Sequence, residues 1–257
     1  MEIEGIRALV TGANRGIGRA FVEELLARGA ALVHATARDL EELQDLAATD
    51  RDRIRPLELD VTDAAGIEEL AAATAELDLL INNAGVDCPA AIAGTEGMAE
   101  IRRAMEVNYF GVLSMSRAFA PVLARSAHSG IINVGSMASF MHVADNTGYC
   151  ASKAAQLMLS HGLRHELSVQ GTRVVQVLPG FVDTDMGSRF PMPKASPRSI
   201  AGAALDGLLV GEDLVLPDRF ARMSYEALVT APERVMRTPD AVVAELVAEL
   251  LANQPAD

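Results

Sequence analysis

Tyr149 and Lys153 stand four residues apart in the segment GYCASKAA, so on a helix both side chains project from the same face. A free tyrosine has a pKa of about 10, and a tyrosine that transfers protons near neutral pH needs a nearby cation to stabilise its phenolate. Lys153, one of only two lysines in the chain, can supply that charge. The pair indicates acid/base chemistry at an oxygen atom, although the same spacing also occurs in solvated pairs on helix surfaces.

A glycine-rich turn, TGANRGIG from Thr11 to Gly18, follows the first apolar run and precedes a helical pattern. In that context Gly12 permits a tight turn, while Gly16 and Gly18 let the backbone approach a pyrophosphate. The free N–H groups and the dipole of the following helix favour its negative charge. The turn therefore predicts a dinucleotide site, with a glycine-rich turn that binds nothing as the alternative.

Two arginines bear on which dinucleotide binds. An acidic residue at the end of the second strand would hold the ribose 2′-hydroxyl of NAD, whereas an arginine there would hold the 2′-phosphate of NADP. That strand ends with Ala37 and Arg38, and Arg15 lies inside the glycine turn. A paired clamp on the phosphate predicts NADP(H) in preference to NAD(H). Two solvated arginines, with Asp39 beside Arg38, are the alternative that keeps NAD(H) open.

The elements that must position these residues alternate along the chain. Short aliphatic or β-branched runs predict strands, and longer runs of helix formers between them predict helices. The predicted strands are 6–10, 31–36, 54–59, 78–82, 130–135, 172–178 and 213–216, and the predicted helices are 17–28, 39–48, 63–75, 99–124 and 149–169. This alternation predicts an α/β fold with a parallel sheet of about seven strands and helices on both faces. Because no linker interrupts it, we expect residues 1–257 to form a single domain.

Two segments late in the chain interrupt the alternation. Residues 183–198, rich in Pro and Met, are predicted to form a loop or lid. Further on, Thr238 and Pro239 offer an N-cap and a first helical residue. The apolar residues that follow recur on one face and predict a C-terminal amphipathic helix; they are Val243, Leu246, Val247, Leu250 and Leu251.

The composition excludes several classes of protein. A net charge of -13 with no basic cluster argues against nucleic acid as a partner, and no apolar run reaches the roughly 20 residues that span a bilayer. The N-terminus lacks the basic start and cleavage site of a signal peptide, and Cys88 and Cys150 are too few for a disulfide framework. We therefore expect a soluble cytoplasmic protein. Abundant Ala and Arg with scarce Lys are typical of a GC-rich bacterial genome.

Four motifs together resemble the short-chain dehydrogenase/reductase family. TGxxxGxG, NNAG, a serine 13 residues before Tyr149, and YxxxK occur in this order and spacing over residues 5 to about 184. The resemblance implies a Rossmann-like doubly wound fold and NADP(H)-dependent oxidoreductase activity. It also implies that Ser136 hydrogen-bonds the substrate oxygen and that Asn108 fixes a helix bend and a water of the proton relay. Ser136 follows a predicted strand at its carboxyl end, where ligands of open sheets bind, and Ser139 is the alternative.

The same resemblance implies a set of cofactor contacts. Asn83, Ala84 and Gly85 line the adenosine ribose, and Asp60 accepts a hydrogen bond from the adenine amine, although an Asp after a strand is also a routine turn residue. The turn from Pro179 to Thr184 meets the nicotinamide carboxamide. The full set of expected cofactor contacts is Gly12, Asn14, Arg15, Gly16, Ile17, Gly18, Arg38, Asp60, Val61, Asn83, Ala84, Gly85, Tyr149, Lys153, Pro179, Gly180, Val182 and Thr184.

The implied reaction is hydride transfer from NADPH to a carbonyl carbon while Tyr149 protonates the oxygen, or its reverse on an alcohol, without a metal. Lys153 also holds the nicotinamide ribose hydroxyls. A fairly apolar small-molecule substrate is expected, because the loop before Tyr149 and the lid carry adaptable side chains: Phe140, Met141, Val143, Met186, Phe190 and Met192. The open alternatives are a non-catalytic NADP(H)-binding sensor or scaffold, a reductase of an imine or conjugated alkene, and a sugar epimerase.

Three histidines and the C-terminal segment have less defined roles. His161 and His165 share the spacing of metal ligands, but no third His or Cys stands nearby. The resemblance implies that their helix packs against its twin in a homodimer, so we expect both on a helix surface or interface. His142 is a candidate for substrate contact. Residues 217–257 depart from the family pattern, and packing on the same subunit, capping the pocket and contacting a partner all stay open for them.

Overall fold

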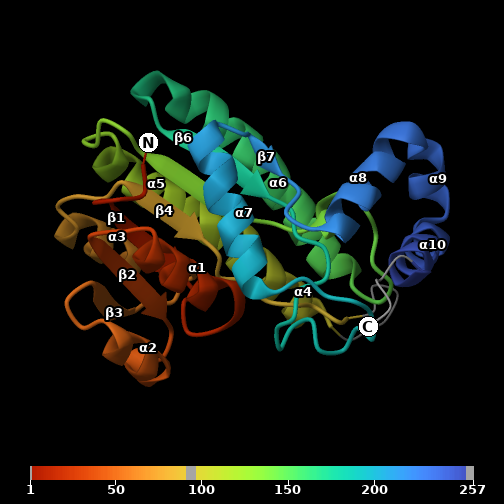
Figure 1. Cartoon of the computed structure of the whole chain (residues 1–257), viewed down its shortest axis with the longest axis horizontal. Helices are drawn as coiled ribbons and strands as arrows, with labels where there is room; N and C mark the ends of the chain where they lie inside the picture. Colours follow the sequence, from red (N-terminus) through yellow and green to blue (C-terminus); the bar gives the residue numbers. More distant parts are fainter. Residues whose placement is uncertain (1, 91–96, 253–257) are drawn as a thin grey trace.

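The computed structural model describes residues 2–90 and 97–252, and a parallel sheet of seven strands lies at its centre (Figure 1). The predicted strands are all confirmed, with ends that differ by one residue at most. They are β1 (Arg7–Thr11), β2 (Leu32–Ala37), β3 (Ile54–Glu58), β4 (Leu79–Asn82), β5 (Gly130–Val134), β6 (Arg173–Val177) and β7 (Leu214–Val215). Their aliphatic content reflects a sheet that is covered on both faces.

The strand order is β3-β2-β1-β4-β5-β6-β7, with every neighbouring pair parallel. The chain runs outward from β1 through β2 to β3 and then returns to the other side of β1 with β4. The winding therefore reverses between β1 and β4, where Val10 pairs with Ile81. Ligands of doubly wound sheets bind in the crevice beyond the carboxyl ends of the strands at this point. The predicted Rossmann-like fold is confirmed.

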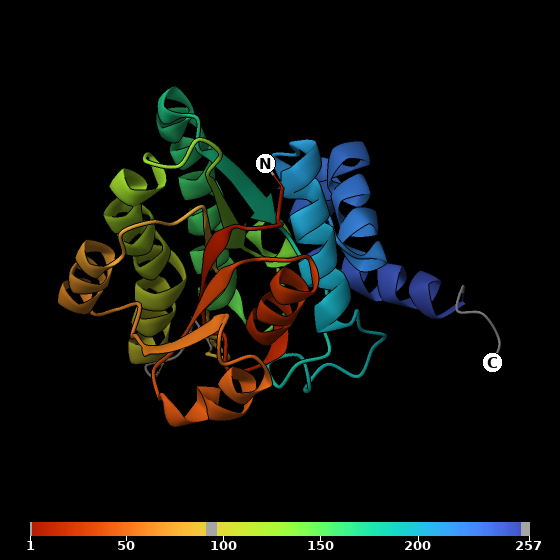
Figure 2. The ribbon, with the colours of Figure 1, turned by 60° about the vertical axis from the view of Figure 1, so that its left-hand side comes forward.

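Helices cover both faces of the sheet (Figure 2). α1 (Gly16–Ala27) and α7 (Pro197–Val210) lie on one face, and α3 (Ala64–Ala73), α5 (Val112–Leu123) and α6 (Thr147–Leu167) lie on the other. The predictions for α1, α3 and α6 are confirmed to within two residues at each end. These helices enclose the sheet, so only its edges and its strand ends are open to ligands.

Two buried apolar clusters fill the spaces between the helices and the sheet. Phe21, Leu25 and Leu205 belong to the cluster on the α1 and α7 face, and Phe119 and Leu163 to the cluster on the opposite face. Phe21 and Phe119 are fully buried. Truncation of such a side chain to alanine costs about 3–5 kcal/mol, so these clusters hold the strand ends at which the site residues emerge.

Two predicted helices are divided in the structure. The one predicted at 39–48 begins as a short 3-10 helix, and the one predicted at 99–124 contains a π-helical turn. The segments are η1 (Glu41–Leu43) and α2 (Gln44–Thr49) for the first, and α4 (Met98–Met105), η2 (Glu106–Gly111) and α5 for the second. The π-helical turn contains Asn108, at which the resemblance implies a helix bend.

Three helices were not predicted: α7, α8 (Arg219–Thr230) and α9 (Pro232–Arg237). α7 begins inside the predicted lid, because Pro197 is its first residue and the Ser196 side chain accepts a hydrogen bond from the backbone N–H of Ser199. These are ordinary helix start signals, but two glycines within the helix weaken its apolar pattern. The lid therefore ends at residue 196.

α8, α9 and α10 (Pro239–Ala252) form a group that we call the C-terminal arm (residues 219–252), to the right of the sheet in Figure 1. α10 begins at the predicted proline. Phe220 and Val242 of the arm pack in one buried cluster with Met137 and Phe181. Of the roles left open for this segment, packing on its own subunit is thus observed.

Candidate active site

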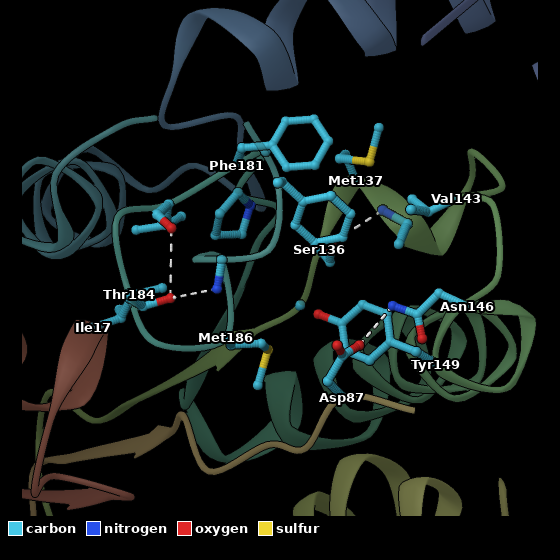
Figure 3. Close-up of a pocket in the computed structure, with 17 residues that line it drawn as sticks. Ile17, Asp87, Ser136, Met137, Val143, Asn146, Tyr149, Phe181, Thr184 and Met186 are labelled. Atoms are coloured by element: carbon cyan, nitrogen blue, oxygen red, sulfur yellow. Dashed lines mark hydrogen bonds between the residues drawn. The ribbon is translucent and has the colours of Figure 1, made fainter. Parts of the chain in front are cut away.

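A pocket opens between the segment after β5, the start of α6 and the segment after β6 (Figure 3). It brings together the predicted catalytic Ser136 and Tyr149 with the predicted nicotinamide turn. Met137 and Phe181 in its wall also contact the C-terminal arm. The lining residues are Ile17, Asp87, Gly135, Ser136, Met137, Ala138, Val143, Asn146, Tyr149, Pro179, Gly180, Phe181, Val182, Thr184, Met186, Gly187 and Phe190.

Tyr149 lies in the first turn of α6, with its side chain half-buried in the pocket wall. Burial raises the pKa of Tyr149 to about 12, while hydrogen bonding with Ser136 acts in the opposite direction and the charges of Asp87 and Cys150 raise it further. At neutral pH the phenol therefore keeps its proton. It can donate that proton to an oxygen atom held in the pocket.

Lys153 lies one turn further along α6, and its Nζ is 5.8 Å from the centre of the Tyr149 ring. The ammonium donates to the Val134 carbonyl at 2.9 Å and to Gln156 Oε1 at 3.2 Å. Burial lowers the pKa of Lys153 to about 8. Lys153 is not among the groups that shift the Tyr149 pKa, and burial of the phenol is the largest cause of its rise.

Ser136 follows β5 and caps the short 3-10 helix η3 (Met137–Ser139), where its Oγ accepts a hydrogen bond from the backbone N–H of Ala138 at 3.1 Å. Its own hydroxyl proton remains to be donated in the pocket that it lines with Tyr149 (Figure 3). Ser139, the alternative, has a buried Oγ without a hydrogen-bond partner in the described part of the chain. Ser136 lines the pocket, whereas Ser139 is not among the described residues that do so. This difference favours Ser136 as the serine that meets the substrate oxygen.

Asn108 is fully buried in the π-helical turn η2. Its Oδ1 accepts from the backbone N–H of Val86 at 2.9 Å, and its Nδ2 donates to the Val86 carbonyl and to Ser152 Oγ. Ser152 in turn donates to the carbonyl of Tyr149. Asn108 therefore joins the segment after β4 to the first turn of α6, and π-helical turns of this kind are frequent at functional sites.

The glycine turn between β1 and α1 requires glycine at three positions. Gly12 and Gly16 have left-handed φ angles of 64° and 54°. A Cβ atom at Gly18 would lie 2.1 Å from the Gly12 carbonyl oxygen and 2.4 Å from Asn83 Nδ2. The turn thus leaves a bare backbone surface at the start of a helix, the shape that a pyrophosphate needs.

The NNAG segment holds this glycine turn in place. Asn83 Nδ2 donates to the carbonyls of Thr11 and Gly12 at 2.8 and 3.0 Å, and Thr11 Oγ1 accepts from the backbone N–H groups of Asn83 and Ala84. A Cβ at Gly85 would lie 3.2 Å from the Oδ1 atom of Asn108. The segment therefore connects the glycine turn to the catalytic side.

The first turn of α1 is open to an anion. Arg15 occupies the N-cap position, and among the described residues no side chain caps this turn. The first backbone N–H groups of a helix have no partner within it, so those of Gly16, Ile17 and Gly18 can bind phosphate oxygens. The residues present fit the pyrophosphate of a dinucleotide.

Arg15, at the N-cap of α1, and Arg38, directly after β2, are both exposed. Arg15 forms an ion pair with Asp185 of the lid at 3.3 Å, in which both side chains are largely exposed. Asn14, another expected contact, donates from Nδ2 to Glu42 at 2.7 Å. A solvent-exposed pair such as Arg15 with Asp185 contributes little to stability, which leaves the guanidinium available to a ligand.

Asp60 and Val61 follow β3. Asp60 Oδ1 accepts from the backbone N–H of Thr62 at 2.9 Å and from its hydroxyl at 2.8 Å, the turn role that the sequence also allowed. Burial acts to raise the Asp60 pKa, but the Thr62 hydrogen bonds and the charges of Arg38 and Arg103 leave it below its ordinary value. Val61 is buried, and a Cβ at Gly111 would lie 2.9 Å from its Cγ2.

The predicted nicotinamide turn is anchored by Asp218, which the sequence reading missed. Gly180 donates its backbone N–H to Asp218 Oδ2 at 2.7 Å, and Asp218 Oδ1 caps α8 by accepting from the backbone N–H of Ala221 at 2.9 Å. At the end of the turn, a Cβ on Gly16 would lie 3.0 Å from Thr184 Cγ2. The turn thus lies between the glycine turn and the C-terminal arm.

The structure places the three histidines away from the proposed chemistry. His142 hydrogen-bonds the Thr147 hydroxyl at 2.9 Å, its Nδ1 lies 3.7 Å from Asp240 of α10, and it is not among the described residues that line the pocket. His161 and His165 are exposed on α6, as expected. Over residues 2–90 and 97–252, no group of three or more His, Cys, Asp or Glu could hold a metal ion.

A doubly wound sheet with a bare glycine turn at its switch point, and Ser, Tyr and Lys side chains at its carboxyl end, defines a dinucleotide-dependent oxidoreductase of the short-chain type. The family model described as short chain dehydrogenase matches residues 7–194. The chain belongs to the short chain dehydrogenase family, whose members include oxidoreductases.

Several known members are similar to this chain. It is 37% identical to D-erythrulose reductase from Gallus gallus over 234 residues, which cover 90% of this chain and 93% of that protein. A short chain dehydrogenase from Burkholderia cenocepacia J2315, solved in complex with NADP, superposes with a TM-score of 0.86 at 37% identity, over 96% of this chain and 99% of that one. NADPH-bound carbonyl reductase from chicken fatty liver gives a TM-score of 0.75 at 32% identity, over 82% and 93% of the two chains.

In residues 2–90 and 97–252, no helix is both long enough and apolar enough to cross a membrane.

Proposed function

We propose that this protein is an NADP(H)-dependent oxidoreductase that reduces a carbonyl group to an alcohol, or runs the reverse reaction, with Tyr149 as the acid/base. The observation that carries this proposal is the pocket itself, in which the hydroxyls of Ser136 and Tyr149 line the same cavity as the turn from Pro179 to Thr184. Two hydroxyl donors at one site suit a single substrate oxygen on which negative charge develops.

The chain's own residues supply the proton and the orientation. A carbonyl oxygen that accepts hydrogen bonds from Ser136 and Tyr149 gains negative charge during reduction, and the Tyr149 phenol transfers its proton to it. Because the Tyr149 pKa is about 12, the phenol is protonated across the physiological range and is poised for the reductive direction. Lys153 places a buried cation near the phenolate that forms. NADPH, when bound, supplies the hydride.

The proposed cofactor site consists of the glycine turn, the first turn of α1, the NNAG segment and the nicotinamide turn. Arg15 and Arg38 are proposed to bind the 2′-phosphate, which favours NADP(H) over NAD(H). Arg38 directly follows β2 and so stands at the carboxyl end of the sheet, as the other proposed contacts do. The NADP bound to the Burkholderia cenocepacia relative supports this choice.

The decisive test is Tyr149→Phe, assayed by NADPH oxidation with a panel of ketones and aldehydes. Loss of the phenolic proton is expected to lower kcat at least about 100-fold while the Kd for NADPH changes little. Tyr225→Phe on the exposed surface of α8 is the matched control, because it removes the same hydroxyl outside the pocket. Wild-type turnover in Tyr149→Phe would refute the acid/base role, and NADPH binding without turnover of any carbonyl would favour a sensor instead.

A further inference from the structure

Asn146 stands at the N-cap of α6, three residues before Tyr149, but its side chain does not cap the helix. Asparagine at this position ordinarily accepts a hydrogen bond from the first turn. Here the side chain turns to the loop after β4 instead, where Nδ2 donates to Asp87 Oδ1 at 2.6 Å (Figure 3). A capping interaction has thus been replaced by a contact inside the pocket.

This contact fixes the orientation of the Asn146 amide. An ionised carboxylate can only accept hydrogen bonds, so the nitrogen must face Asp87 and the oxygen must face elsewhere. Asn146 is 3% exposed, and its Oδ1 has no hydrogen-bond partner in the described part of the chain. Buried polar atoms are nearly always paired, so an acceptor left unpaired in a ligand pocket points to a donor that the ligand brings.

Asp87 lies on the same wall and completes this acceptor group. Its Oδ2 forms an ion pair with Arg189 of the lid at 3.0 Å, and the Arg189 guanidinium also lies over the Phe190 ring at 4.5 Å from its centre. The Asp87 side chain keeps 21% of its surface exposed. Because Arg189 balances the Asp87 charge, the group favours a neutral donor such as a hydroxyl over an ammonium.

The position of the group relative to Tyr149 sets where that hydroxyl must lie. Asn146, the N-cap of α6, precedes Tyr149 by three residues, and both line the pocket together with Asp87. Asp87 also acts electrostatically on the Tyr149 phenol. A donor that meets Asn146 and Asp87 is therefore close to the carbonyl oxygen that meets Tyr149. Apart from these groups, Ser136 and Thr184, the described lining consists of glycines and apolar side chains, among them Met186 and Phe190.

We propose that Asp87 and Asn146 form an acceptor subsite for a hydroxyl group on the carbon next to the substrate carbonyl. This inference rests on the proposed function and names its substrate class: α-hydroxy ketones with an apolar remainder, reduced to vicinal diols. The hydroxyl is bound and not consumed, since the carbonyl alone takes up a hydride and a proton.

Three aryl ketones test this subsite with NADPH and the wild-type protein: 2-hydroxyacetophenone, 2-methoxyacetophenone and propiophenone. The methoxy compound keeps the electron-withdrawing oxygen but has no donor, so it separates recognition of the hydroxyl from activation of the carbonyl. We expect kcat/KM for the hydroxy ketone to exceed that for the methoxy ketone by about 30-fold, as for a buried acceptor left unpaired by the wrong substrate. Equal values for the two would overturn the proposal.

Near-isosteric variants assign the effect to its residues. Asn146→Leu and Asp87→Leu are each expected to bring the ratio of hydroxy to methoxy ketone below about 3, because each removes an acceptor that only the hydroxy ketone uses. Thr147→Val removes the neighbouring hydrogen bond to His142 in the same loop and should leave the ratio unchanged. A ratio that falls equally in Thr147→Val would show a general loop effect and refute the assignment.

Binding separates this inference from the proposed function. The Kd values of the same ketones for the protein in the presence of NADP⁺, measured by calorimetry, report on the subsite without turnover. If no ketone is reduced but the hydroxy compound binds about 30-fold more tightly than the methoxy compound, the subsite stands and the reductase proposal fails. If ketones are reduced and bound without that preference, the reductase stands and the subsite is refuted.

Discussion

Replacing Lys153 with methionine probes the buried ammonium without a large change in side-chain volume. Burial holds the pKa of Lys153 at about 8, below its ordinary value of 10.5. The folded protein therefore binds the lysine proton less tightly than the unfolded chain does. A lowered pKa in the folded state means that protonated Lys153 destabilises the fold, and that this effect is largest below pH 8, where both states are protonated.

The magnitude follows from the two pKa values. The difference between 10.5 and about 8 corresponds to about 3 kcal/mol at pH 7, from about 1.4 kcal/mol for each tenfold change in proton affinity. As the pH rises from 7 to 10, the folded protein loses this proton first, and roughly 2 kcal/mol of the destabilisation is relieved. Lys153→Met has no such proton. The free energy of unfolding of the wild type should thus rise by about 2 kcal/mol relative to the variant over this range.

Urea unfolding of both proteins at pH 7, 8, 9 and 10 measures this difference. Lys153→Met removes the lysine donor from the Val134 carbonyl, which keeps Gln156 Nε2, and from Gln156 Oε1, but that loss is the same at each pH and cancels from the slope. The other titratable groups, including Tyr149 and the two cysteines, are present in both proteins. Parallel stability curves would show that the Lys153 pKa is close to that of an exposed lysine, and the reasoning would fail.

Three further predictions concern the cofactor site. Arg38→Asp should lower the ratio of kcat/KM for NADPH to that for NADH by about 10–100-fold, and an unchanged ratio would remove Arg38 from the 2′-phosphate site. Gly18→Ala places a Cβ 2.1 Å from the Gly12 carbonyl oxygen and should weaken NADPH binding at least about tenfold. Gly162→Ala is the control: a Cβ at this position meets no neighbouring atom within 4 Å, so this variant should bind NADPH normally. Asp218→Asn keeps a cap for α8 but leaves one backbone N–H, that of Gly180 or Ala221, without its acceptor. Thermal and urea unfolding should therefore show that the free energy of unfolding falls by about 1–2 kcal/mol. An unchanged unfolding midpoint would mean that this anchor is dispensable.

The sheet was predictable because its strands are short aliphatic runs between clear turn signals. β5, for example, is buried along its whole length and reads Gly-Ile-Ile-Asn-Val. α7 escaped prediction although Ser196 and Pro197 mark its start, since Gly202 and Gly207 dilute its pattern. The π-helical turn at Asn108 could not be inferred from periodicity either, because the register of that helix is set by contacts to Val86 and Ser152 from distant parts of the chain.

The site residues likewise fall into those that the sequence could reveal and those that it could not. Ser136, Tyr149 and the glycine turn could be found from local spacing, and the structure brings the first two into one pocket. Asp87 and Asp218 could not, because their partners lie far away in sequence: Asp87 meets Asn146 and Arg189, while Asp218 meets the turn at Gly180. A helix N-cap signal was available at Asp218, but it says nothing about a second partner.

Buried side chains form a hydrogen-bonded chain at the centre of the sheet, where Asn82 Oδ1 and Gln176 Nε2 nonetheless have no partner among the described residues. In the centre of the sheet, Asn82 donates to Asn133, which donates to Ser160. At the pocket, burial lowers the pKa of Lys153 to about 8, while the Asn146 side chain does not cap α6 and its Oδ1 has no partner among the described residues. Selection for stability alone would not retain both features seven residues apart at the N-terminal end of α6. Their coincidence at the start of α6 is what chemistry on a bound oxygen and recognition of its neighbour would require.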